Sequence, residues 1–375
     1  MKFIHTADWQ IGMRAAHVGA AGQRVRDERL EAARRVVKEA MAAEVDFVAV
    51  AGDTFEDNGV DRVLVQKVAD ILAEFKGPVY LIAGNHDPLV PGSVWEHPVW
   101  GSHTNLNVIE AVEPLEVPGG VLYPCPAREK HSNRNPLQWI DAIKSKSVTI
   151  GMAHGTVEGI HQEEPDYPIP RDAPARTGLD YVALGHWHST ATYAAPDGTT
   201  RMAYSGSHEP TKFGEPRSGN ILLVEIAERG ESPILTPLRT GGLSWEVKEE
   251  DLRQPGDLAR LRSEIETIEN PSVKLLQVTI KGVLSAEEAH EQSRIREILQ
   301  SRFLYGWVDD SHGVPSPEDD SWFTGLPAGS LRNTAFTLRE LADPSYLGER
   351  PEGASSEVAS RALLELYALI SEVPK

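Results

Sequence analysis

Five times along this chain, a run typical of a buried strand is followed closely by side chains that can bind a metal ion. The five runs are residues 3–6, 47–50, 79–82, 148–150 and 181–184. The patches that follow them are residues 8–10, 52–53, 84–87, 154–155 and 185–188. Parallel strands covered on both faces are apolar throughout, and ligands collect at their carboxyl ends. The pattern therefore predicts an α/β fold whose strand ends deliver carboxylate, amide and imidazole groups to one point.

The types of donor indicate which metals such a point would bind. The chain has one cysteine, Cys125, so thiolate-rich structural zinc sites are excluded. Carboxylates combined with imidazoles suit Mn²⁺, Fe²⁺ or Zn²⁺. The number of donors indicates two ions, and two ions about 3.5–4 Å apart are a common arrangement for in-line attack on a phosphate ester.

Helical and strand patterns predict how the chain is divided. Helices are expected over residues 26–43 and 61–75, between the apolar runs, and short strands from residue 119 onward predict a second sheet packed on the first. We expect a first domain at residues 1–245 and a second, with a strand-helix-strand pattern, at 246–345. Residues 311–330 are expected to form a loop. A tail at 346–375 should contain an amphipathic helix at 355–372.

Composition limits the compartment and the partners. The single cysteine favours a reducing cytoplasm, and the absence of an 18-residue apolar run predicts no membrane span. The net charge of −19 disfavours tight binding of nucleic acid by this chain alone. If the substrate is a nucleic acid, a basic partner is expected to contribute to binding.

The motifs themselves resemble a known family. They are HTADWQIG at 5–12, AGDTF at 51–55, AGNHD at 83–87, AHG at 153–155, LGHWH at 184–188 and YSGSHEPTKFGE at 204–215. This set resembles the calcineurin-like metallophosphoesterase superfamily and, within it, SbcD-type DNA-repair nucleases. The resemblance is strong over about residues 1–240. It implies a four-layer α/β/β/α sandwich with a small C-terminal α+β domain that caps the site and borders the DNA.

The resemblance also implies roles for individual residues. The first metal would be held by Asp8, Gln10, Asp53 and His188. The second would be held by Asp53, Asn85, His154 and His186, with Asp53 bridging the two ions. His86 would stabilise the transition state or protonate the leaving oxygen, and Asp87 would orient His86 through its other ring nitrogen.

A further stretch and two departures from the family pattern bear on DNA. His208 and Lys212 lie where the family has a loop near the active site, so contacts to the DNA backbone are expected there, with a structural turn as the alternative. Gln10 stands where the family usually has His, and an amide oxygen is a weaker donor than imidazole. Glu56 stands where the family's nucleases commonly carry a His that helps present DNA for exonuclease cleavage.

The expected function is a two-metal DNA nuclease that hydrolyses phosphodiester bonds in repair or end processing. Mn²⁺ is the expected ion, with Mg²⁺, Fe²⁺ and Zn²⁺ as alternatives, and the expected partners are DNA and an SbcC-type, SMC-like ATPase. A homodimer is compatible with this interpretation. Two alternatives stay open: a small-molecule phosphodiesterase or phosphatase on the same fold, and a weakly catalytic subunit that is a scaffold for the ATPase.

Overall fold

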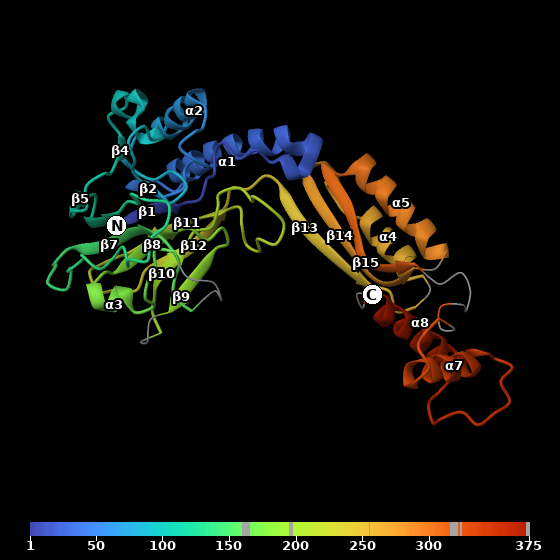
Figure 1. Cartoon of the computed structure of the whole chain (residues 1–375). Coiled ribbons are helices and arrows are strands. Elements are labelled where there is room, and N and C mark those ends of the chain that lie inside the picture. The colour runs from blue at the N-terminus through green and yellow to red at the C-terminus, as the bar shows by residue number, and fades with distance from the viewer. Residues whose placement is uncertain are drawn as a thin grey trace. The chain divides into compact units, whose positions relative to one another are not determined.

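A computed structural model of the chain describes residues 1–159, 166–194, 198–254, 256–284, 286–315, 322 and 325–372. The chain divides into two compact units, Met1–Ser244 and Trp245–Lys375 (Figure 1). Of the helices in the described part of the chain, none combines the length and the apolar composition that a membrane crossing requires.

The first unit is built on two six-stranded sheets. One has the order β12-β11-β1-β2-β3-β4, with β1 (Lys2–Thr6), β2 (Phe47–Ala51), β3 (Val79–Ile82), β4 (Leu106–Val108), β11 (Asn220–Glu225) and β12 (Ile234–Arg239). The other has the order β5-β6-β7-β8-β10-β9, with β5 (Leu115–Val117), β6 (Gly120–Cys125), β7 (Val148–His154), β8 (Tyr181–Gly185), β9 (Ala191–Ala194) and β10 (Thr200–Tyr204). Strands β1 to β4 are parallel, as are β6, β7, β8 and β10.

The two sheets pack face to face between outer layers. Phe3 and Phe47 stack at 4.7 Å in the interface, and the edge of the Tyr181 ring meets Phe3 from the second sheet. The outer face of the first sheet is covered by α1 (Gly22–Ala42) and α2 (Arg62–Ala73), and the outer face of the second by α3 (Ala173–Thr177) and residues 137–142. The predicted sandwich of two sheets between helical layers is confirmed.

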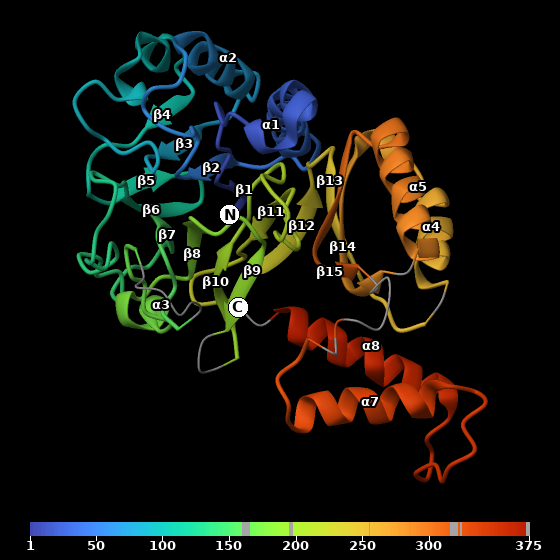
Figure 2. The same cartoon turned by 45° about the vertical axis from the view of Figure 1, so that its right-hand side comes forward.

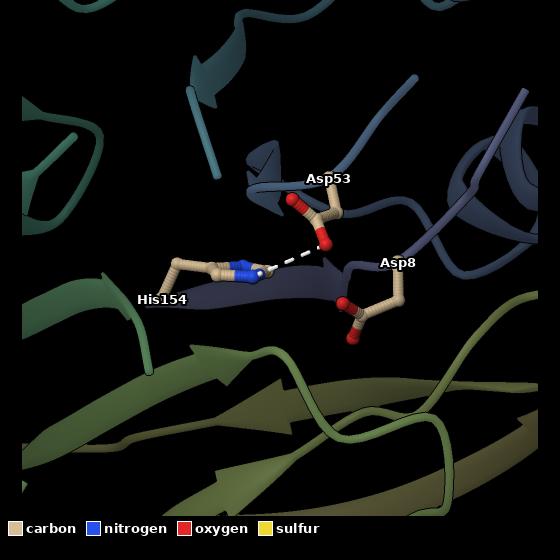
Figure 3. Close-up of side chains that lie close together, drawn as sticks. All are labelled: Asp8, Asp53 and His154. Carbon is tan, nitrogen blue, oxygen red and sulfur yellow. Dashed lines mark ion pairs between the residues drawn. The ribbon is translucent and has the colours of Figure 1, made fainter. Parts of the chain in front are cut away.

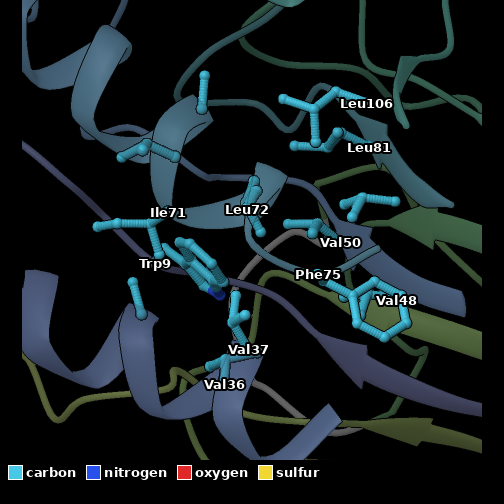
Figure 4. Packing of buried hydrophobic residues seen from close by; sticks show 14 of the residues in the cluster. Trp9, Val36, Val37, Val48, Val50, Ile71, Leu72, Phe75, Leu81 and Leu106 are labelled. Atoms are coloured by element: carbon cyan, nitrogen blue, oxygen red, sulfur yellow. The ribbon is translucent and has the colours of Figure 1, made fainter. Parts of the chain in front are cut away.

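Packing under α1 and α2 explains why the central strands are apolar on both faces. Val48 and Val50 of β2 point towards these helices and meet Val37 and Leu72 there, as Figure 4 shows. Neighbours such as Phe47 and Ala49 point to the other sheet. Burial of one such side chain stabilises the fold by about 1.5–3 kcal/mol. The strands are thereby fixed, and the loops at their carboxyl ends are anchored.

The second unit contains a three-stranded sheet of β13 (Ser244–Asp251), β14 (Lys274–Leu284) and β15 (Tyr305–Pro315). Helices α4 (Asp257–Glu266) and α5 (Ala286–Arg302) pack on this sheet through Leu258, Ile280 and Leu299 (Figure 2). Helices α7 (Ser330–Ala342) and α8 (Ser356–Glu372) follow and contact one another. Short 3-10 helices lie at Ala16–Ala21, Val94–Glu96, Pro98–Ser102 and Pro271–Val273.

One expected boundary in this unit is wrong. The loop expected at 311–330 is shorter, because β15 pairs with β14 as far as Pro315 and α7 begins at Ser330. Residues 316–321 and 323–324 of that loop lie outside the described residues.

Candidate metal centre

Three buried side chains form the middle of the site. Asp8 follows β1, Asp53 follows β2 and His154 ends β7, and one ligand atom from each lies within 4.8 Å of the other two (Figure 3). All three are at most 1% exposed. Parallel strand ends from both sheets thus bring together residues that lie far apart in the sequence.

The backbone around these donors is unusual. Asp8, Gln10 and Asp53 have φ values of 55°, 48° and 51°, in the left-handed region that few residues other than glycine adopt. Such strained residues cluster at functional sites. Gly84 permits the close approach, because a Cβ added there would lie 2.2 Å from Oδ1 of Asp53.

The predicted second set of donors converges on Asn85. Its Oδ1 lies 3.0 Å from Nε2 of His154 and 3.2 Å from Nδ1 of His186. Nε2 of His154 also lies 3.3 Å from Oδ2 of Asp53. Nδ1 of His154 can donate to the carbonyl of Ala51 at 2.9 Å, which leaves Nε2 as the coordinating atom. The four predicted donors are therefore linked by close contacts through Asn85 and His154.

The predicted first set is more open. The amide nitrogen of Gln10 donates to Oδ2 of Asp53 at 2.9 Å. The amide oxygen of Gln10 is buried and has no hydrogen-bond partner among the described residues. Leaving a buried acceptor unpaired costs about 1–3 kcal/mol. A cation beside this oxygen would remove that cost, so the residues present fit a metal ion.

His188 completes the first set from the other sheet. Its Nδ1 is held by Oε1 of Glu215 at 2.7 Å and Oγ1 of Thr211 at 3.1 Å, which leaves Nε2 to coordinate. A carboxylate behind a histidine is the usual arrangement at protein metal sites, because it fixes the tautomer and raises the basicity of the ring. Burial alone would raise the pKa of Glu215, but its hydrogen bond to His188 lowers it to about 2.

The charged groups at the centre shift one another's pKa values. Burial raises the pKa of Asp8 to about 6, against the opposing charges of His154 and His188. Burial would also raise the pKa of Asp53, but His154 outweighs it and holds this pKa below its usual range. The pKa of His154, lowered by burial alone, is raised to about 9 by Asp53. Each partner thus favours the charged form of the other, and a divalent cation would compete with a proton on His154.

Comparison with known proteins identifies the family. A model of the calcineurin-like phosphoesterase family matches residues 1–190. The chain belongs to this family. Members of this family are metal-dependent phosphoesterases that bind two divalent cations.

Individual relatives are distant. An uncharacterized metallophosphoesterase of Bacillus subtilis, YhaO, is 25% identical over 244 residues, which cover 60% of this chain and 57% of YhaO. The chain thus spans little more than half the length of this relative. TT1561 of Thermus thermophilus has 13% identity and a TM-score of 0.43, covering 64% of this chain and 98% of TT1561. A dimetal phosphatase from Danio rerio has 13% identity and a TM-score of 0.41, covering 63% and 98% of the two chains.

The predicted pairing of His86 with Asp87 is wrong. Both carboxylate oxygens of Asp87 accept backbone N–H groups, from Phe55 at 2.9 Å and from Gly84 at 2.7 Å. Nδ1 of His86 instead lies 2.9 Å from the carbonyl oxygen of Glu56, to which it can donate. Asp87 therefore shapes the ligand loop, and a backbone carbonyl orients His86.

The prediction that His208 contacts DNA is also wrong. The His208 side chain is fully buried, stacks on Trp9 at 4.8 Å and donates from Nε2 to the carbonyl of Arg29 at 2.8 Å. A group in this position cannot reach a DNA backbone. Lys212 is exposed, so its contact with DNA stays a prediction.

Two residues that serve the site were not predicted from the sequence. Glu215 lies in the motif at 204–215, but its pairing with His188 joins segments 27 residues apart. Arg29 is 1% exposed. The sequence carries a sign of this burial, because Arg29 falls on the buried stripe of α1 between Val25 and Ala33. A charged residue on an apolar stripe indicates a buried polar role.

Proposed function

We propose that the chain is a Mn²⁺-dependent phosphodiesterase that cleaves DNA. The observation that carries this proposal is the position of Asp53. Its Oδ2 accepts a hydrogen bond from the amide nitrogen of Gln10, in the first donor set, at 2.9 Å and lies 3.3 Å from Nε2 of His154, in the second. One carboxylate group thus adjoins both sets, which is the position that a bridging ligand of two ions would need.

The proposed chemistry divides between the cations and the side chains. Two divalent ions, when bound, supply a nucleophile at neutral pH and neutralise the charge on the phosphate. Asp8, Gln10, Asp53 and His188 would hold one ion, and Asp53, Asn85, His154 and His186 the other. His86 is not among these donors. Because the carbonyl of Glu56 holds its Nδ1–H, Nε2 of His86 can face the substrate and, in the imidazolium form of the ring, donate a proton to the leaving oxygen.

DNA as the substrate is supported by the motifs. The stretch 204–215, which resembles SbcD-type nucleases, supplies Thr211 and Glu215 behind His188. The net charge of −19 argues that the chain alone holds DNA weakly. We therefore propose an SbcC-type, SMC-like ATPase as partner, a capping or DNA-binding role for residues 246–345, and action in the cytoplasm.

The test compares two substrates on the full chain with Mn²⁺: end-labelled linear DNA, single- and double-stranded, and bis-p-nitrophenyl phosphate. Asp53→Ala is the control for contaminating nuclease. We expect cleavage of both substrates by the parent chain and of neither by the control. Turnover of the chromogenic diester without DNA cleavage, even with the ATPase added, would favour the small-molecule phosphodiesterase. Two bound ions with no turnover of either substrate would favour the scaffold subunit.

A further inference from the structure

Arg29 is a buried cation whose hydrogen-bond acceptors, among the residues that the structure describes, are main-chain oxygens. Its Nε donates to the carbonyl of Trp9 at 2.8 Å, and its Nη2 also reaches this carbonyl and that of Asp8. Its Nη1 donates to the carbonyls of Glu209 and Pro210 at 3.0 and 3.1 Å. One guanidinium thus joins two segments that lie about 200 residues apart in the sequence.

Both segments serve the first donor set. Residues 8–10 carry Asp8 and Gln10. Residues 209–215 carry Thr211 and Glu215, which hold Nδ1 of His188. The second donor set shares Asp53 with the first, and the backbone N–H of His186 donates to the Asp8 carboxylate at 2.9 and 3.1 Å. Asn85 and His154 follow other strands, and Arg29 donates no hydrogen bond to the segments that carry them.

Arginine would be a costly residue at position 29 if its side chain only filled space in the core. A buried cation loses its hydration, and an apolar side chain of similar size would fill the same volume without that loss. Burial lowers the pKa of Arg29 only to about 10, so it stays charged at neutral pH, and the acidic groups Glu209, Glu215, Glu56 and Asp8 offset its charge. The planar guanidinium group of Arg29 can donate hydrogen bonds to four carbonyls in fixed directions, and the single ammonium group of lysine cannot.

We propose that Arg29 is a positioning residue for the first metal ion. It holds the loop of Asp8 and Gln10 in register with the segment that orients His188, and so sets the distance between the donors of that ion. The proposal rests on the two-metal function proposed above.

The chain offers a matched control in Arg229. This arginine also donates to main-chain carbonyls, of Ala142 at 3.0 Å and Gly178 at 2.6 Å, and pairs with Asp180 at 2.6 Å. It lies beside Thr149, near the start of β7, whereas His154 ends that strand. Arg229→Lys therefore perturbs a similar carbonyl cluster away from the donors.

The experiment measures Mn²⁺ binding by calorimetry to the full-length parent, Arg29→Lys and Arg229→Lys, and assigns each site from anomalous peaks in crystals. Arg29→Lys should weaken the first ion about 10- to 100-fold, the effect typical of residues that support metal ligands, and leave the second unchanged. Arg229→Lys should leave both ions unchanged. Equal weakening of both ions, or no weakening, in Arg29→Lys would overturn the proposal.

Folding is checked through the melting temperature, and Arg29→Met provides a second variant of similar length. If neither Arg29 variant folds while Arg229→Lys does, Arg29 belongs to the fold and the proposal is wrong. Measurements on the parent chain distinguish the two proposals. If the parent binds two ions but cleaves no DNA, the proposed substrate is wrong. The effect of Arg29 on metal binding can still be measured in that case.

Discussion

The two predicted donor sets share Asp53, yet their side chains meet differently. In the second set, Oδ1 of Asn85 lies within hydrogen-bonding distance of both His154 and His186. In the first set, the amide oxygen of Gln10 has no partner among the described residues, and His188 is held from behind by Glu215. Besides Asp53, the second set thus has two imidazoles and one amide, whereas the first has one imidazole, one amide and the carboxylate of Asp8.

Loops on one scaffold can thus form two metal sites of unequal affinity. Each set has one amide, but the second set has two imidazoles where the first has one, and imidazole is a strong donor to first-row divalent ions. We therefore expect the second ion to bind tightly and the first to exchange readily. The first set also depends on contacts between distant segments, which Arg29 and Glu215 make, and this favours weaker binding of the first ion.

The largest expected effect comes from the residue that both sets share. Asp53→Ala removes a ligand of each ion, so both ions should be lost and turnover of bis-p-nitrophenyl phosphate should fall below detection. Elemental analysis of the purified variant measures the metal content. Retention of one full equivalent of metal would show that the two sets do not depend on one bridging carboxylate.

A large effect without metal loss is expected at His86, which lies outside both sets. His86→Ala removes the proposed proton donor, so turnover should fall about 10²- to 10⁴-fold. Both ions should stay bound, because no predicted ligand is changed. If elemental analysis instead finds less metal, His86 belongs to one of the donor sets.

A moderate effect, confined to the first set, is expected at Glu215. Glu215→Gln weakens the hold on Nδ1 of His188, so Mn²⁺ should bind the first set about 10- to 100-fold more weakly. Calorimetric titration resolves the two binding steps. Thr211→Val is the matched control, since it removes the longer contact to the same nitrogen and should have the smaller effect. Loss of the second ion would contradict the division into two sets.

The smallest effect is a gain. Gln10→His replaces the amide with the imidazole that the family usually carries, so half-maximal activity should require less Mn²⁺. The second ion should be unaffected. If the parent chain is already saturated at the first set and the substitution changes nothing, Gln10 is a full ligand and the inequality between the sets disappears.

Much of the fold could be predicted because it depends on local pattern. The apolar runs at 47–50 and 79–82 are strands β2 and β3, and the stripes at 26–43 and 61–75 are helices α1 and α2. Order along the chain placed Asp8, Asp53 and His154 at strand ends, where the structure brings them within 4.8 Å. Whether each predicted ligand binds metal stays a prediction.

The errors concern side chains whose partners are distant or belong to the backbone. Asp87 accepts main-chain N–H groups, which no sequence pattern reveals, so its expected pairing with His86 was wrong. His208 lies in a segment that reads as a surface loop but is buried beside Trp9. Arg29 was missed because its acceptors are carbonyls on segments that only the fold brings together.

Anomalous diffraction at the manganese edge, from crystals of the full chain grown at increasing Mn²⁺, shows directly whether Asp53 bridges two ions of unequal affinity. We expect two peaks flanking Asp53. The peak among Asn85, His154 and His186 should fill at the lower concentration, and the peak beside Gln10 and His188 should fill later. A single peak at saturating Mn²⁺, or earlier filling beside Gln10, would contradict this expectation.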